Sequence, residues 1–244
     1  MIEVRALTAQ QEFSDAVALQ KVIWGFEDVE LLPLRLFVVA TKIGGQAFGA
    51  FHDGRMIAFC LAIPGLKPGG HYYLHSHMLG VLDEYRNQGV GRMLKLRQRE
   101  DALARAIPLV EWTFDPLELK NAYFNIMRLG AVVRRYVLNQ YGITGSHLHG
   151  ALPTDRCVAE WWVGGERARA LLDSPSGRLP RSAPVASIRV PMVAAKLRTE
   201  DPKRAREIQK SVSDQFLEHV SKGLAVTGFE KTESEGVYLF EPWQ

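Results

Sequence analysis

The chain has 244 residues and a formal net charge of +3 at pH 7, with 47% hydrophobic and 23% charged residues. This composition is typical of a soluble globular protein and argues against a disordered or fibrous one. The slight charge and the scattered Lys and Arg residues disfavour nucleic acid as a partner. No apolar stretch approaches the roughly 20 residues that cross a bilayer, so we expect no membrane contact. Cys60 and Cys157 lie in apolar runs, which predicts buried, reduced thiols and a cytoplasmic protein.

Hydrophobic periodicity predicts a mixed order of strands and helices in the first part of the chain. In chain order, the pattern gives a strand at 2–6, a helix that starts after Thr8 and ends at 24, a second helix at 34–43, strands at 47–51, 56–63 and 71–81, a helix at 91–106, a strand at 108–114, a helix at 119–129 and a strand at 132–138. Thr8 is the expected N-cap of the first helix. The Asp53-Gly54 pair has the chemistry of a tight turn and predicts a hairpin between the second and third strands.

The pattern loosens after Tyr141 and resumes as a second group of elements. This group comprises a strand at 156–163, a linker rich in Pro, Ser and Gly at 173–187, a strand at 187–193, a helix from 201 or 202 to 222, and a hairpin of 224–231 with 237–240. We therefore predict a core domain over residues 1–150 and a C-terminal extension or second lobe over residues 151–244.

Two glycines, Gly89 and Gly91, follow an extended strand and open a helix. Without Cβ atoms at these positions, consecutive N–H groups can converge on one anion. A helix N-terminus also carries about half a positive charge, which favours a pyrophosphate group, and Arg86 and Arg92 add charge nearby. The alternative is a tight strand-to-helix turn that binds no ligand. The spacing differs from that of a P-loop and of a dinucleotide fingerprint.

The pattern Arg-x-x-Gly-x-Gly follows a strand that ends Leu-x-Val and precedes an amphipathic helix with Leu94, Leu96 and Leu103. With the element order of residues 1–140, it resembles the signature of the GNAT superfamily of N-acyltransferases. The resemblance implies an α/β (α+β) fold, in which helices flank a mixed, mostly antiparallel sheet and the extension adds strands and a helix. It also implies acetyl-CoA or another acyl-CoA as co-substrate, with no metal. The residues that it assigns to acyl-CoA are Leu79, Gly80, Val81, Arg86, Asn87, Gln88, Gly89, Val90, Gly91 and Arg92. The amides of Asn121 and Asn125, on the predicted helix at 119–129, are further candidates to bind the pantetheine arm, with helix capping as the alternative for Asn121.

The resemblance further implies a bulged strand that diverges from its parallel neighbour, with acyl-CoA in the V between them. A backbone N–H near Met78 or Leu79 would then polarise the thioester carbonyl as an amine attacks it. No covalent enzyme intermediate is required.

Three side chains are candidate bases for the attacking amine. His75 and His77 alternate on one strand and so share a face, and Glu111 lies on the neighbouring strand. Hydrogen-bonded histidines of a sheet are the alternative for the first two. For the acid, relatives place a tyrosine four residues before a glycine, but this chain has Ile126 there. Tyr123, one helical turn earlier, is the substitute candidate, and unaided loss of the thiolate is the other option.

Arg156 stands at the mouth of an apolar strand and is a candidate ligand for a substrate carboxylate, with a surface salt bridge as the alternative. The run from Trp112 to Leu117, with Asn121 to Asn125, also resembles a bacterial branch of the superfamily for which acylation of amino acids, with succinyl-CoA as donor, is implied.

Two functions remain open from the sequence. The first is transfer of an acetyl or longer acyl group from acyl-CoA to the amine of a small molecule, with an amino acid as one candidate. The alternative is a non-catalytic module of the same fold that binds acyl-CoA or a metabolite, favoured by the missing tyrosine. The expected partner is a small-molecule amine acceptor, and a homodimer is left open.

Overall fold

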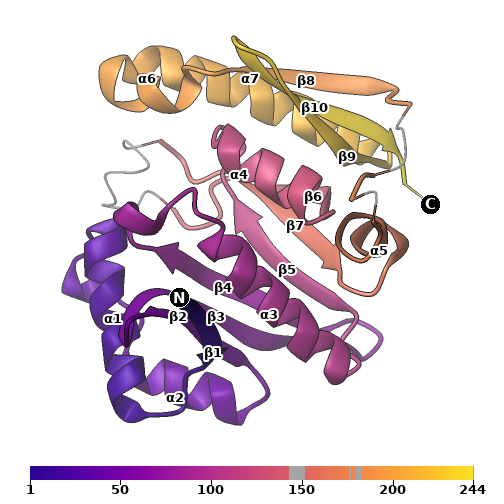
Figure 1. The fold of residues 1–244 in the computed structure, drawn as a ribbon. Helices are drawn as coiled ribbons and strands as arrows, with labels where there is room; N and C mark the ends of the chain where they lie inside the picture. Colours follow the sequence, from indigo (N-terminus) through magenta and orange to yellow (C-terminus); the bar gives the residue numbers. More distant parts are fainter. Residues whose placement is uncertain (143–151, 176, 180–182, 244) are drawn as a thin grey trace. The chain divides into compact units, whose positions relative to one another are not determined.

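The computed structural model describes residues 1–142, 152–175, 177–179 and 183–243. The chain folds into two compact units, Met1–Glu111 and Trp112–Gln244, whose elements are labelled in Figure 1. The predicted boundary at residue 150 lies outside the described residues, so the division into domains at that point stays a prediction.

The first unit contains a sheet and the helices that flank it. Its elements are β1 (Ile2–Ala6), α1 (Gln10–Trp24), η1 (Asp28–Glu30), α2 (Leu34–Lys42), β2 (Gln46–His52), β3 (Arg55–Lys67), β4 (His71–Val81), η2 (Asp83–Tyr85), α3 (Val90–Ala104) and β5 (Leu109–Phe114), of which the last three residues belong to the second unit. The strands follow the order β1-β2-β3-β4-β5. Neighbours are antiparallel except β4 and β5, which are parallel. The predicted order of elements is confirmed here.

Alternation along β4 places helices on both faces of this sheet. A Cβ at Gly80 would meet Ile23 and Trp24 of α1, whereas the side chains of Leu79 and Val81 lie against Gly91 of α3. Because successive residues of a strand point to opposite faces, α1 and α3 cover opposite faces of the sheet. The helix that follows the glycine loop therefore packs directly on the strand that precedes it.

Local chemistry explains the turn and the helix start. Asp53 (φ 49°) and Gly54 (φ 79°) are both left-handed, as the two-residue hairpin turn requires, so the predicted hairpin is confirmed. The predicted N-cap was wrong by one residue: Ala9 is the N-cap of α1. The carboxylate of Glu12 accepts hydrogen bonds from the backbone amides of Thr8 and Ala9, at 2.7 and 3.0 Å. Glu12 therefore caps the helix in place of the Thr8 hydroxyl, which was the predicted cap.

The buried face of α3 also differs from the prediction. Leu94 is fully buried, but Leu103 is 44% exposed. Two polar residues, Lys95 and Gln98, are buried instead. The apolar spacing alone could not show this, because Leu94, Gln98 and Ala102 form the row that faces the sheet.

The second unit contains the remaining strands and helices. Its elements are α4 (Leu119–Tyr123), the π-helical η3 (Phe124–Arg128), β6 (Val132–Val137), β7 (Arg156–Trp162), α5 (Glu166–Leu172), β8 (Ala186–Pro191), α6 (Ala194–Glu200), α7 (Pro202–Ser221), β9 (Leu224–Lys231) and β10 (Glu235–Pro242). The strands follow the order β7-β6-β9-β10-β8, and their described pairs are antiparallel. The predicted fold class, with extra C-terminal strands, is confirmed. Neither α5 nor α6 was predicted, because seven residues give too short a periodic signal.

An aromatic cluster holds α7 against this sheet, along β8, β9 and β10 (Figure 1). Phe216 of α7 stacks on Tyr136 with ring centroids 4.7 Å apart, and its edge contacts involve Tyr238 and Phe240 at 5.1 and 5.5 Å. The Tyr238 hydroxyl donates to the Pro116 carbonyl at 2.6 Å. The second unit therefore has an aromatic core, to which the extension and residues before it, such as Tyr136, both contribute.

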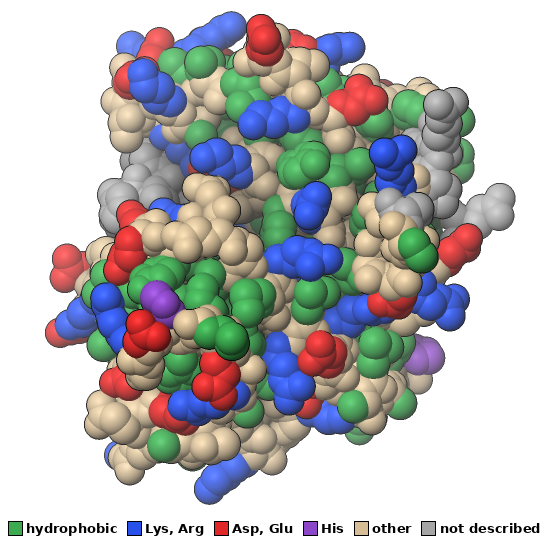
Figure 2. Space-filling view, viewed as in Figure 1, with side chains coloured by type: hydrophobic (Ala, Val, Ile, Leu, Met, Phe, Trp, Pro, Cys, Tyr) green, Lys and Arg blue, Asp and Glu red, His purple; other side chains and the backbone are tan. Residues whose placement is uncertain are grey.

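On the face drawn in Figure 2, basic and acidic side chains both occur among apolar ones. Of the described helices, none is both long and apolar enough to cross a bilayer.

Candidate functional site

The glycine loop joins β4 to α3 and adopts a backbone that favours glycine. Asn87 (φ 63°) and Gly89 (φ 83°) are both left-handed, a conformation that costs other residues about 1–2 kcal/mol. Gly89 is the N-cap of α3 and supplies no side-chain cap. The first helical hydrogen bond of α3 runs from Met93 N to Gly89 O, at 3.0 Å, so the amides of residues 90–92 precede it. Such amides are the donors that helix N-termini offer to anions.

Space is open beside this loop. A Cβ at Gly89 would meet no heavy atom within 4 Å, and one at Gly91 would make only an ordinary contact with Leu79, at 3.5 Å. Neither glycine is therefore required to avoid a clash within the chain. The left-handed backbone explains the glycine at position 89. Room for a ligand close to the amides is a further reason for glycine at both positions.

The side chains of the loop play two different parts. Arg86 Nε donates to Val81 O at 3.3 Å and its guanidinium pairs with Asp83 at 2.9 Å, while Gln88 donates to Glu84 O at 2.7 Å. These contacts tie the loop to itself. Arg92, in the first turn of α3, has a buried Nε with no hydrogen-bond partner in the described structure. The guanidinium charge of Arg92, so close to the start of α3, would favour an anion at the loop. The residues present thus fit a pyrophosphate group.

A β-bulge interrupts β4 at His77. On β3, Leu61 pairs with Met78 and the next residue, Ala62, pairs with Ser76, so His77 is the extra residue. The described parallel pairs between β4 and β5 are Leu74 with Val110 and His75 with Glu111. The pairing with β5 therefore reaches no further than His75, directly before the bulge. A bulge at such a point redirects side chains and loosens the ladder locally.

The three predicted bases lie together around this bulge. The rings of His75 and His77 have centroids 6.0 Å apart, and Glu111 is in register with His75. The His77 side chain is exposed, and partial desolvation by the surrounding protein lowers its pKa below the ordinary value. It is therefore neutral near pH 7 and able to accept a proton.

Glu111 is buried and accepts a hydrogen bond from Lys67 Nζ of β3. Lys67 also lies over the ring of Tyr73, 5.2 Å from its centroid. Glu111 therefore enters this site as one member of a largely buried ion pair. Sequence reasoning missed Lys67, which looks like an ordinary residue at the end of a strand.

In the second unit, a π turn changes the register of the helix that carries Asn121, Tyr123 and Asn125. The amide of Leu129 donates to Phe124 O, five residues back, at 3.1 Å. The predicted position of the acid, four residues before Gly130 at Ile126, assumed a regular α-helix. The π turn adds one residue to this turn of the helix, so that spacing does not apply here. Asn121 and Tyr123 are exposed, whereas Asn125 and Ile126 are buried. The roles predicted for the first three stay predictions.

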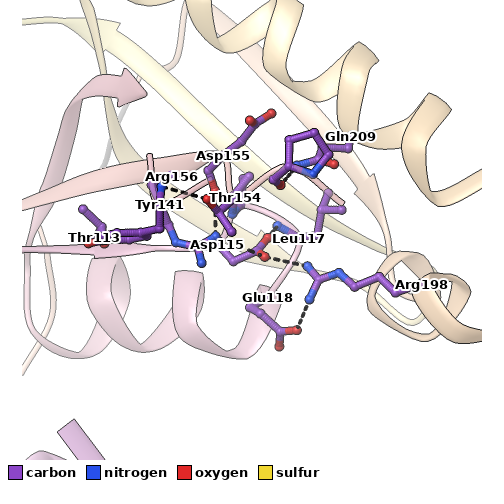
Figure 3. A network of polar contacts seen from close by, with 12 residues as sticks. Thr113, Asp115, Leu117, Glu118, Tyr141, Thr154, Asp155, Arg156, Arg198 and Gln209 are labelled. Carbon is purple, nitrogen blue, oxygen red and sulfur yellow. Dashed lines mark hydrogen bonds and ion pairs between the residues drawn. The ribbon is translucent and has the colours of Figure 1, made fainter. Parts of the chain in front are cut away.

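Arg156 lies in a buried network of this second unit, drawn in Figure 3. The carboxylate of Asp115 pairs with Arg198 at 2.8 Å and with Arg156 at 3.5 Å, and Arg198 also pairs with Glu118 at 3.0 Å. Arg156 is only 7% exposed and donates to the Asp155 carbonyl at 3.0 Å. Its contacts here are thus interior ones rather than the surface pair that the sequence suggested, and its part in substrate binding stays a prediction.

The fold and the loop together point to a class of protein: the bulged strand β4, a glycine turn and the helix α3 follow one another, as the resemblance to acyl-CoA-dependent transferases implies. Residues 14–120 match the Acetyltransferase (GNAT) family. This match covers residues 14–120 of the 244 and supports membership of the GNAT superfamily, in agreement with the resemblance seen in the sequence.

Solved structures share this fold at low sequence identity. The ribosomal-protein-S18-alanine N-acetyltransferase of Escherichia coli is 17% identical, with a TM-score of 0.53 over 68% of this chain and 97% of its own. A GNAT acetyltransferase of Streptococcus pneumoniae is 15% identical, with a TM-score of 0.54 over 67% and 100%. Arabidopsis thaliana NAA60, in complex with a bisubstrate analogue, is 15% identical, with a TM-score of 0.53 over 66% and 98%. At these identities the likeness shows the fold alone. No curated protein matches the sequence.

Among the residues that the structure describes, no group of three or more His, Cys, Asp and Glu side chains could hold a metal ion.

Proposed function

We propose that the protein transfers an acyl group, acetyl or a longer one such as succinyl, from acyl-CoA to the amine of a small molecule. An amino acid is the acceptor class that we favour, on the resemblance of the Trp112–Leu117 segment described above. The observation that carries the proposal is the anion site at the start of α3 directly beside the bulge of β4. The buried thiols Cys60 and Cys157 support a reducing compartment such as the cytoplasm.

The donor is held at its charged end by the glycine loop. The amides of residues 90–92 donate to the pyrophosphate, and the α3 dipole and the Arg92 guanidinium favour its charge. Arg86 and Gln88 keep the loop in shape through their contacts with the chain. Leu79 to Val81 run along the pantetheine arm on this proposal.

The reacting end lies at the bulge. A backbone N–H near Met78 or Leu79 donates to the thioester carbonyl oxygen and stabilises the negative charge that develops there as the amine attacks. His77, neutral at pH 7 because desolvation lowers its pKa, accepts the proton that the amine loses. The C–S bond then breaks and the CoA sulfur leaves as thiolate, or takes a proton from Tyr123.

Glu111 has a second part in the proposal. Its carboxylate is buried and paired with Lys67, so in this proposal it helps to shape the site next to His75 and does not transfer a proton. This is the reason that we favour His77 over Glu111 as the base: Glu111 already receives a hydrogen bond from an ammonium group.

Calorimetric titration with acetyl-CoA and succinyl-CoA tests the donor site. Wild-type protein and Gly89→Trp are compared with Gly54→Trp, a control at another left-handed glycine whose Cβ would also meet open space. We expect Gly89→Trp to lose binding and Gly54→Trp to keep it. Equal loss in both variants, or no binding by the wild type, would refute the donor site.

An amine screen with the preferred donor follows, with release of free thiol as the readout. Turnover with one class of amine supports the transferase. Binding of acyl-CoA without turnover of any amine would favour the non-catalytic module instead.

A further inference from the structure

A buried polar chain joins α3 to β4 behind the bulge. Lys95 Nζ donates to Ser76 Oγ at 2.9 Å, and Ser76 Oγ donates to Gln98 Oε1 at 3.1 Å. All three side chains are buried, with Lys95 3% exposed. Because Lys95 and Gln98 are three residues apart on α3, they lie on one face and together hold a single hydroxyl group.

Stability does not explain a lysine at this position. Burial of an ammonium group is unfavourable, and well-packed apolar replacements of buried charges are often neutral or stabilising. Desolvation lowers the pKa of Lys95 to about 7, with the buried Cys60 thiol of β3 nearby. A residue kept at such a cost points to a role other than packing.

The place of Ser76 suggests that role. It directly precedes His77, the residue that has no partner on β3, and it follows His75, the last residue of the described pairing with β5. The ladder therefore holds the backbone less firmly around the bulge. Ser76 is itself paired with Ala62, and its side-chain anchor adds to the ladder directly before His77, which has no partner on β3.

The anchor belongs to the same helix that begins at the glycine loop. α3 starts after Gly89 and carries Lys95 and Gln98 in its second and third turns. A rigid helix thus links the two ends of the donor site: its N-terminus faces the pyrophosphate and its buried side chains hold the bulge.

We propose that Lys95 is a positioning residue for acyl transfer: it holds Ser76 and thereby places the backbone donor of the bulge against the thioester carbonyl. This inference rests on the proposed function. It extends that function to a residue that touches neither donor nor acceptor.

The test uses the infrared stretch of acetyl-CoA labelled with 13C at the thioester carbonyl, bound to the protein. The variants are Lys95→Met, Ser76→Ala and the double variant. The control is Gln46→Met, because Gln46 is equally buried and donates to α3, to Gln98 O at 3.0 Å and Asp101 at 2.8 Å, through contacts that lie on β2 rather than β4. Dissociation constants for acetyl-CoA are measured in parallel.

In the wild type we expect a carbonyl band below that of free acetyl-CoA, because the bulge donor polarises the bond. Lys95→Met and Ser76→Ala should return the band toward the free value while affinity changes by no more than about twofold, since the loop holds most of the ligand. The double variant should be no worse than the worse single variant, because both act through one contact. With an active acceptor, kcat should fall by about 10–100-fold at unchanged KM for acetyl-CoA.

Each outcome separates the two ideas. If the wild type does not bind acetyl-CoA, the proposed function fails and this inference fails with it. If the wild type binds with a shifted band and Lys95→Met and Ser76→Ala keep that band, Lys95 does not position the bulge, although the donor site stands. An equal band change in Gln46→Met would also overturn the inference, since general loosening of α3 would then be the cause.

Discussion

Gly89→Ala offers a quantitative test of the glycine loop. Gly89 has φ 83°, and a Cβ there would meet no heavy atom within 4 Å, so the variant adds backbone strain without a clash. The left-handed conformation costs alanine about 1–2 kcal/mol. If the free loop keeps this conformation, the cost appears as lost stability. If the free loop relaxes and the ligand restores it, the cost appears as lost affinity, about 5–30-fold.

The two losses therefore sum to about 1–2 kcal/mol, whichever way they divide. Urea unfolding gives the first and calorimetric titration with CoA gives the second. Gly89→Asn should lose less, since asparagine tolerates this conformation, as Asn87 (φ 63°) does in the same loop. Gly54→Ala, at another left-handed glycine, should lose stability alone. A Gly89→Ala variant with unchanged stability and unchanged affinity would refute the strain argument.

Three further predictions concern the bulge and the core. His77→Gln should lower kcat by about 10²–10⁴-fold. In the wild type, kcat/KM should fall on the acid side with a pKa below 6.5, because desolvation lowers the pKa of His77 in the folded protein. An acid-side pKa above 6.5 would exclude His77 as the base. Lys67→Met should lower the free energy of unfolding, measured in urea, by about 1–3 kcal/mol, because it leaves the buried Glu111 carboxylate without its ammonium partner. Adding Glu111→Gln to Lys67→Met should restore part of that free energy. An unchanged free energy of unfolding in Lys67→Met would show that the pair is not formed. Burial raises the pKa of Cys60 to about 12 and that of Cys157 well above its usual range. A thiol reagent should therefore modify neither cysteine in the native protein and both after unfolding. Rapid modification of the native protein would contradict the burial of the two thiols.

The order of elements and the donor loop follow from local patterns, which is why the sequence predicted them. An extended run over residues 71–81 marks β4, Asp53-Gly54 marks the hairpin, and Gly89 and Gly91 mark the start of α3. Each of these signals is contained in one short stretch of the chain, and the residues of that stretch set the backbone geometry that it requires.

Tertiary packing decided the rest. Lys95 is buried because the face of α3 that meets β4 is chosen by how the helix packs, and the leucine spacing had pointed to Leu96 and Leu103 instead. The bulge at His77 exists only as a mismatch in register between β4 and β3, so no pattern within β4 could reveal it. Contacts between residues distant in sequence, such as Lys67 with Glu111, form only when the strands come together, and the sequence by itself gives no sign of them.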